Sequence, residues 1–200
     1  AAISKMGQVS WAVSARAMAE APSGERRLVE LRGVGGAYPL AGKVELQGAA
    51  SLGEALAPLN GVPGAAVEQT LLDRLGLELG DRLLVGNTPM VARAVLLQEP
   101  DRLSRGFALG PRVLTRMEVV EQGGFLAPGL PFGETARIAL PPGEATATAA
   151  KILRKALKGA EARIRERDEA APGIRRLIEQ LEYFLGFIGL ASLVAGGLGV

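Results

Sequence analysis

The stretch at residues 8–18 reads QVSWAVSARAM, and its side chains alternate in character from one position to the next. One side carries mainly apolar residues, namely Val9, Trp11, Val13 and Ala15. A period of two is typical of a half-buried β-strand. After a Pro-Ser-Gly break at residues 22–24, residues 27–34 alternate again, so we expect two neighbouring strands.

Short strands and tight turns follow these two strands. The glycines at 33–36 could suggest a phosphate-binding loop, but the Gly-Lys-Ser/Thr ending of such a loop is missing. We therefore interpret them as a strand break. A short strand is expected at 43–46. Residues 47–66 are small and rich in Gly and Pro, which predicts a loop.

Residues 67–99 hold the clearest local pattern of the chain. A short helix at 67–75 is expected to end at Gly76. Apolar runs at 82–85 and 90–97 flank Gly86-Asn87, and this spacing predicts a β-hairpin.

Residues 123–133 are apolar but rich in turn residues, so we expect a loop before a strand at 135–140. Residues 144–158 predict an amphipathic helix. Its apolar face holds Ile152, Leu153, Ala156 and Leu157, and its basic face holds Lys151, Arg154, Lys155 and Lys158. A solvated face is the simpler interpretation of these basic residues, and contact with lipid headgroups is the alternative. Another short strand is expected at 162–166.

These elements predict an α+β fold whose first lobe is split in the sequence. Residues 1–35 and 133–172 would form an α/β lobe, because the later strands can complete a sheet with the N-terminal ones. Residues 36–132 would form an inserted, β-rich lobe. Residues 173–200 would form a stem helix that runs into a membrane.

The composition excludes several kinds of active site. The chain has no Cys and no His, which removes thiol nucleophiles, Ser-His-Asp triads and zinc sites built on sulfur or imidazole. Its net charge of +2 is spread along the sequence, whereas nucleic-acid binding needs a clustered basic surface. Together these features disfavour an enzyme and disfavour a nucleic-acid partner.

The C-terminal segment changes abruptly in composition. Pro172 is suited to open a helix, and apolar residues then recur at helical spacing up to Ile188. Residues 183–200 carry no charged side chain and include five glycines, a composition that membrane helices tolerate. We therefore expect the start of a transmembrane helix. The alternative is a buried C-terminal helix of a soluble periplasmic binding or scaffold module.

Two sets of residues are candidates for function. The first is a stem that would couple the membrane to the domain, formed by Ile174, Arg175, Arg176, Leu177 and Leu181. The second is an apolar surface for a partner or lipid, drawn from turn-rich segments: Tyr38, Leu40, Phe125, Leu126, Leu130 and Phe132, with Phe107 nearby. Burial of this second set under loops is the other interpretation.

One further pair of residues could carry acid–base chemistry. Glu99 and Asp101 lie on a Pro-containing turn beside Arg102. A salt-bridged turn is the simpler interpretation, and a carboxylate-dependent hydrolase is the alternative.

Three groups of motifs resemble one family. They are LRGV at 31–34 with AYPLAG at 37–42; LDRLGL at 72–77 with GD at 80–81 and QEPDR at 98–102; and PGIRR at 172–176 with FL at 184–185 and GGLGV at 196–200. The chain resembles the extracytoplasmic domain of an FtsX/MacB/LolE-type ABC transporter permease, closest to the YbbP-like branch.

The resemblance implies a split porter-like lobe with an inserted β-rich lobe, on the periplasmic side of the bacterial inner membrane. It implies that this domain binds no cofactor, since a separate cytoplasmic ATPase subunit binds ATP. It further implies a lipid, lipoprotein or other hydrophobic substrate, or a periplasmic partner such as a thioesterase or lysophospholipase-like protein.

Overall fold

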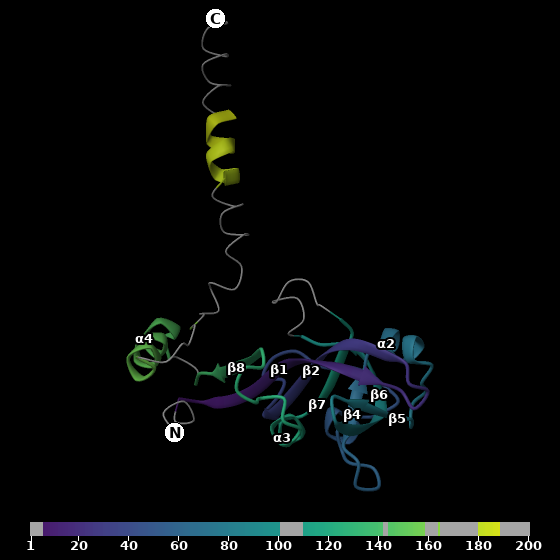
Figure 1. Ribbon diagram of the computed structural model, residues 1–200. Helices are drawn as coiled ribbons and strands as arrows, with labels where there is room; N and C mark the ends of the chain where they lie inside the picture. Colours follow the sequence, from purple (N-terminus) through teal and green to yellow (C-terminus); the bar gives the residue numbers. More distant parts are fainter. Residues whose placement is uncertain (1–5, 101–109, 142–143, 159–163, 165–179, 189–200) are drawn as a thin grey trace, which may run out of the picture. The chain divides into compact units, whose positions relative to one another are not determined.

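The computed structural model describes residues 6–100, 110–141, 144–158, 164 and 180–188 (Figure 1). The chain divides into two compact units, residues 1–142 and residues 143–200, which are described separately. The first unit contains, in chain order, β1 (Gln8–Glu20), β2 (Arg26–Gly36), β3 (Glu45–Gln47), α1 (Leu52–Ala55), β4 (Gly64–Val67), α2 (Gln69–Leu75), β5 (Arg82–Val85), β6 (Thr88–Gln98), β7 (Arg112–Arg116), α3 (Met117–Gln122) and β8 (Phe132–Ala139). The second unit contains α4 (Thr146–Ala156) and a helical segment at residues 180–188.

One mixed sheet joins all the strands within the described part of the first unit. Its order is β2-β7-β4-β6-β5-β1-β8, and β3 pairs with β6. An additional pairing of β1 with β2 joins the path back on itself, so β1, β2, β7, β4, β6 and β5 form a closed ring. The β2–β7 and β4–β6 pairs are parallel, and the other pairs are antiparallel. A large mixed sheet with short helices confirms the predicted α+β class.

The two N-terminal strands are confirmed as an antiparallel pair. Ala17 lies opposite Val29 and Ala15 opposite Leu31, and these four residues are buried in one hydrophobic cluster. The turn at residues 21–24 closes with a hydrogen bond from the Gly24 amide to the Ala21 carbonyl. The alternation at 8–18 is visible here because one face of this strand pair lies over the core.

The glycines at 33–36 do not break the strand, contrary to the prediction. The β2 strand runs through Gly33, and a Cβ atom there would lie 2.6 Å from Cγ2 of Val120 in α3. Gly33 therefore lets α3 pack directly against β2. The strand ends only at Gly36, which has a positive φ of 67°.

The predicted loop at 47–66 is also wrong in part. It contains α1 and the start of β4, which lies between β7 and β6 in the sheet. All four β4 residues are buried, because neighbouring strands and packed side chains cover them on every side. A short, fully buried strand of small residues has no alternation, so the pattern search missed it.

Other local predictions are confirmed. The α2 helix ends at Gly76, which adopts the left-handed conformation at φ 62° and ψ 39°. β5 and β6 form the expected hairpin around Gly86-Asn87. β8 and α4 also lie where the sequence placed a strand and a helix. The strand expected at 162–166 falls outside the described residues.

The predicted division into two lobes stays a prediction. β2 pairs with β7, and β1 pairs with β5, so strands from both predicted lobes share one sheet. Strands on either side of the predicted boundaries at residues 36 and 132 are therefore hydrogen-bonded to each other.

Candidate functional site

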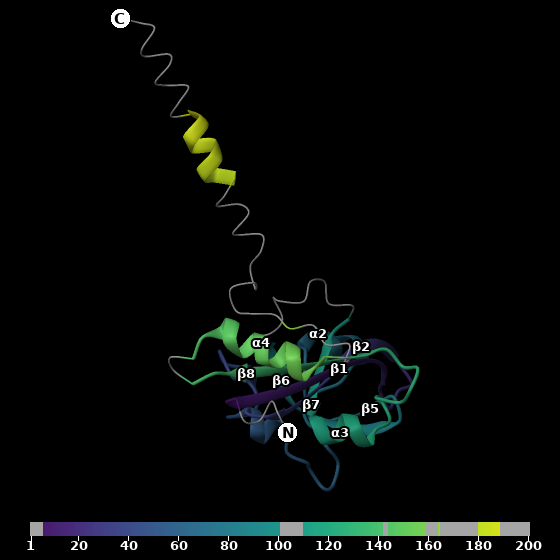
Figure 2. The same cartoon turned by 90° about the vertical axis from the view of Figure 1, so that its left-hand side faces the viewer.

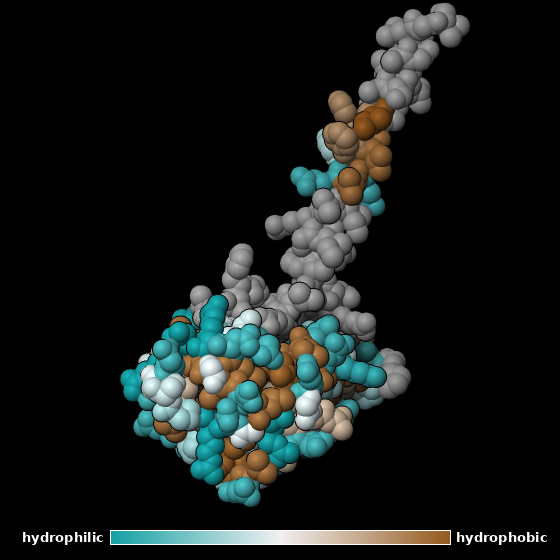
Figure 3. Space-filling model, turned by 90° about the vertical axis from the view of Figure 1, so that its right-hand side faces the viewer, coloured by the Kyte–Doolittle hydropathy of each residue, from teal (hydrophilic) through white to brown (hydrophobic). Residues whose placement is uncertain are grey.

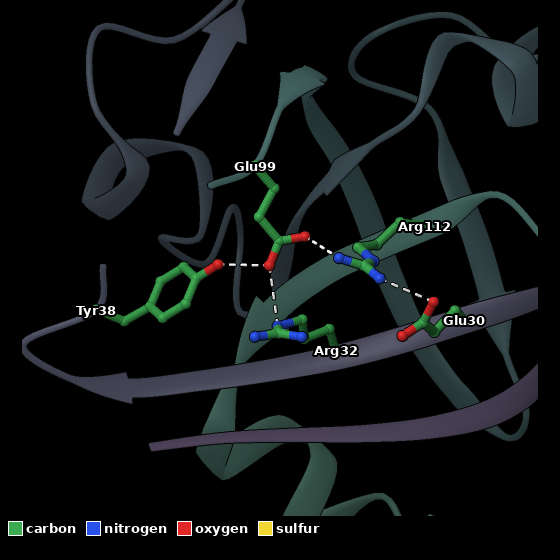
Figure 4. A network of polar contacts seen from close by, with 5 residues as sticks. All are labelled: Glu30, Arg32, Tyr38, Glu99 and Arg112. Atoms are coloured by element: carbon green, nitrogen blue, oxygen red, sulfur yellow. Dashed lines mark hydrogen bonds and ion pairs between the residues drawn. The ribbon is translucent and has the colours of Figure 1, made fainter. Parts of the chain in front are cut away.

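A buried polar network lies where β2, β7 and the end of β6 meet. Glu30 and Arg32 alternate along β2, and Arg112 on the parallel strand β7 lies in register with Glu30. Glu99 follows directly after β6, and Tyr38 follows β2. Four separate segments thus supply the five side chains, which Figure 4 shows converging.

Both carboxylate oxygens of Glu99 are occupied (Figure 4). Oε1 accepts a hydrogen bond from the Tyr38 hydroxyl and lies 2.9 Å from Nε of Arg32. Oε2 accepts a hydrogen bond from Nη1 of Arg112. Nη2 of Arg112 donates to Oε2 of Glu30 at 2.8 Å.

The centre of this network is shielded from bulk solvent, and its formal charges cancel. The side chains of Arg32 and Glu99 are 0% and 1% exposed, and that of Arg112 is 4% exposed. Two arginines face two glutamates, and the Tyr38 ring lies 5.7 Å from the Arg32 guanidinium carbon. Buried ions are tolerated only when they are paired, so each charge here depends on the others.

The network also sets the protonation of its members. Burial by itself would raise the pKa of Glu99, but the charge of Arg32, the hydrogen bond from Tyr38 and the charge of Arg112 outweigh it and lower that pKa. For Arg112, burial would lower the pKa, and the hydrogen bond to Glu30 with the charge of Glu99 raises it instead. Both groups are therefore held in their charged forms.

This environment corrects the predicted role of Glu99. Glu99 does form ion pairs, but its partners are Arg32 and Arg112 from other strands, and its side chain is buried. A carboxylate with both oxygens occupied and a lowered pKa is poorly suited to act as a general acid or base. Asp101 and Arg102 fall outside the described residues.

The partners of Glu99 were not predicted from the sequence. Glu30 and Arg32 occupy alternate positions along β2, and charged side chains in such an alternation give no sign of burial. The residues around Arg112 form no pattern that would predict its pairing, because only the register of β7 with β2 brings it beside Glu30.

The six residues of the predicted apolar surface do not share one environment. Tyr38 packs against one hydrophobic cluster, and Leu126 and the buried Phe125 belong with the other. Leu40 is half-buried, whereas Leu130 and Phe132 are 51% and 43% exposed. Phe107 lies outside the described residues. Phe125 is therefore a core residue and not part of a surface.

Most of the predicted stem lies outside the described residues, including Ile174, Arg175, Arg176 and Leu177. Leu181 lies in the helical segment at 180–188 and is 50% exposed. Figure 3 shows apolar side chains around this segment. Among the helices that the structure describes, none combines the length and the apolar composition of a membrane span.

Several solved structures resemble this chain. The periplasmic region of MacB from Actinobacillus actinomycetemcomitans matches with a TM-score of 0.51 and 15% identity, over 77% of this chain and 67% of that one. The extracellular domain of the noncanonic ABC-type transporter YknZ from Gram-positive bacteria matches with a TM-score of 0.51 and 11% identity, over 77% and 78%. The chain has the fold of a MacB-like periplasmic domain.

A third structure agrees with this MacB-like fold. A domain of a proposed permease protein from Porphyromonas gingivalis matches with a TM-score of 0.52 and 16% identity, over 80% of this chain and 69% of that one. No protein-family model and no curated protein matches the sequence. The MacB-like fold thus agrees with the predicted family, and the YbbP-like branch stays a prediction.

Proposed function

We propose that the chain is the extracytoplasmic domain of an ABC transporter permease subunit in a bacterial inner membrane. The observation that carries this proposal is the MacB-like fold, which covers 77% of this chain and is shared with periplasmic and extracellular domains of transporters. Function does not follow from fold alone, so the proposal needs support from the second unit of the chain.

The helical segment at 180–188 supplies that support. Every side chain in it is exposed, and the large apolar ones include Tyr183 at 83%, Phe184 at 61% and Phe187 at 66%. From Tyr183 to Ile188 the segment has no charged residue, and a helix that is apolar on all sides is stable only under cover from protein or lipid. The charge-free sequence from 183 to 200 favours lipid. The charge-free composition of 183–200 therefore favours the membrane interpretation over a buried helix of a soluble module.

The proposed role is to couple ATP hydrolysis by a cytoplasmic ATPase subunit to events outside the cytoplasm. The stem, Ile174 to Leu181, would transmit movement between the bilayer and the domain. Lipid, lipoprotein or another hydrophobic molecule would be the substrate. A periplasmic partner, such as a thioesterase or lysophospholipase-like protein, is the finer proposal that follows from the YbbP-like resemblance.

The Glu99 network has a defined part in this proposal. It links β2, β7, the end of β6 and the segment after β2 through buried ion pairs and hydrogen bonds. In this proposal, these contacts would restrain sliding between β2, β7 and the end of β6. A rigid ring can pass on a movement of the stem as a whole, whereas a soft one would absorb it.

The location of the domain can be tested by labelling, because the chain has no native cysteine. Ser23 lies exposed in the β1–β2 turn, and Ser10 is 2% exposed in β1. We would express S23C and S10C from the complete gene in bacterial cells. After permeabilising any outer membrane, we would add a membrane-impermeant maleimide.

Rapid labelling of S23C in intact cells, with S10C labelled only after denaturation, is the expected result. It would place the folded domain outside the cytoplasm. Labelling of S23C only after cell lysis would place the domain in the cytoplasm and refute the proposal. S10C serves as the matched control, because its labelling in intact cells would report unfolding instead of location.

A further inference from the structure

The α4 helix carries a face with only positive charge. From Thr146 to Lys158 every charged side chain is basic, and all four basic side chains are exposed. At 3.6 residues per turn, Lys151, Arg154 and Lys155 fall within about 100° of the helix circumference. Lys158 follows directly after the C-cap residue Leu157, at the same end of the helix as Arg154 and Lys155. Figure 2 shows α4 in full view.

An exposed apolar side chain borders this basic face. Ile152 is 53% exposed, whereas Ala149 and Ala150 on the other side of the helix are 4% and 3% exposed. Ile152 and the basic residues therefore lie on the exposed side of α4. A helix that presents basic residues beside an exposed apolar one is typical of helices that lie at a membrane interface.

We propose that this face of α4 binds the anionic headgroups of the phospholipid bilayer to which the chain is attached. The inference deepens the proposed function, because it requires the chain to be held at a membrane. Residues 159–179 span at most roughly 70 Å when extended, so α4 stays within reach of the surface that the segment at 180–188 would enter.

The chemistry of the face favours lipid over an acidic protein. Three of its four basic residues are lysines, which act as mobile point charges and do not form the rigid two-point contacts of arginine. No acidic side chain lies on the face, so it has no pattern of alternating charge that would fix the orientation of a protein partner. A continuous layer of phosphate charge needs no such register.

Reconstitution of the full chain into vesicles tests the proposal. Two single-cysteine variants would carry a bimane fluorophore: T148C beside the basic face, where Ile152 is retained, and I188C in the apolar helical segment. Brominated lipids quench the fluorophore when it lies in the bilayer. Vesicles of phosphatidylcholine alone would be compared with vesicles that also contain phosphatidylglycerol.

We expect the fluorophore at 188 to be quenched in both kinds of vesicle. The fluorophore at 148 should be quenched only with phosphatidylglycerol, and high salt should reverse this by screening the charges. A basic residue near an anionic surface contributes about fivefold to binding, so K151Q/K155Q/K158Q should weaken the phosphatidylglycerol preference by up to roughly 100-fold. The control R16Q/R74Q/R82Q removes the same charge from exposed sites of the first unit and should leave the preference unchanged.

The other outcomes separate this inference from the proposed function. Quenching at 188 without any quenching at 148 would overturn headgroup binding and leave membrane attachment standing, with an acidic protein as the remaining occupant to test. Equal quenching at 148 in both kinds of vesicle, or equal loss in the control variant, would also overturn it. No quenching at either position would overturn both proposals.

Discussion

Neutralising Glu99 should destabilise the first unit strongly. In E99Q, the guanidinium of Arg32 loses its carboxylate, and the new amide group faces donors of Arg112. At the 2.9 Å between Nε of Arg32 and Oε1 of Glu99, two unit charges attract by about 6 kcal/mol at an effective dielectric constant of about 20. Breaking a buried pair by removing one partner typically costs about 3–5 kcal/mol, and we expect E99Q to fall in that range.

An exposed ion pair provides the control for this prediction. Nε of Arg26 lies 2.8 Å from Oε2 of Glu20, but these side chains are 64% and 31% exposed. Exposed pairs contribute about 0–1 kcal/mol, so E20Q should lower the free energy of unfolding by less than about 1 kcal/mol. The comparison holds the distance nearly constant and varies the burial.

Urea unfolding followed by tryptophan fluorescence measures both variants. Trp11 is the single tryptophan of the chain and lies in β1, so its emission reports on the first unit. The free energy of unfolding follows from the midpoint and the slope m. Equal losses in E99Q and E20Q would refute the claim that burial makes the network important.

A double variant separates lost charge balance from lost packing. E99L leaves Arg32 buried and uncompensated, whereas R32M/E99L removes both charges and leaves the Arg112–Glu30 pair intact. We expect the double variant to be more stable than E99L by at least about 2 kcal/mol. A double variant that is no more stable than E99L would show that lost volume, and not an unpaired charge, causes the defect.

Further predictions concern the Glu99 network and the contact between Gly33 and Val120. The pKa of Glu99 is lowered in the folded state. The stability that Glu99 contributes to the fold should therefore be complete above its unfolded pKa of about 4.3, and should disappear as the pH falls through the lowered folded pKa. The free energies of unfolding of wild type and E99Q should converge in acid. Y38F removes the hydroxyl that donates to Glu99, should cost about 1–3 kcal/mol, and should move that acid transition to higher pH; an unchanged transition would contradict the hydrogen bond. G33A should cost about 1–3 kcal/mol in urea unfolding, because its methyl group meets Val120 at 2.6 Å, whereas G133A, with open space around it, should change stability by less than about 0.5 kcal/mol. If V120A does not restore stability to the G33A variant, the contact with Val120 is not the cause of the loss.

Local patterns predicted the elements whose own residues determine them. The alternation at 8–18 and 27–34 predicted β1 and β2, because one face of that pair lies over the core. Gly76 predicted the end of α2, since only a residue that tolerates the left-handed conformation fits there. Gly86-Asn87 predicted the β5–β6 hairpin for a similar reason.

Elements that depend on distant neighbours escaped prediction. The small residues of β4 form a strand only because β6 and β7 supply its hydrogen bonds. Gly33 and Val120 are far apart in the sequence, and their close approach turns an apparent strand break into a packing site. Neither contact leaves a periodic signal in the residues nearby.

By itself, then, the sequence determined the strand pair, the hairpin, the α4 helix and the charge-free C-terminal segment, because spacing, turn residues and charge act over a few positions. Only the tertiary structure decided that the strands close into one ring and that Glu99 is buried. The pairing of β2 with β7 brings Arg112 beside Glu30, and the end of β6 brings Glu99 between Arg112 and Arg32. A carboxylate that was expected to form a salt bridge within its own turn is instead a buried ion, because its partners lie on other strands. Local sequence patterns do not carry such long-range register.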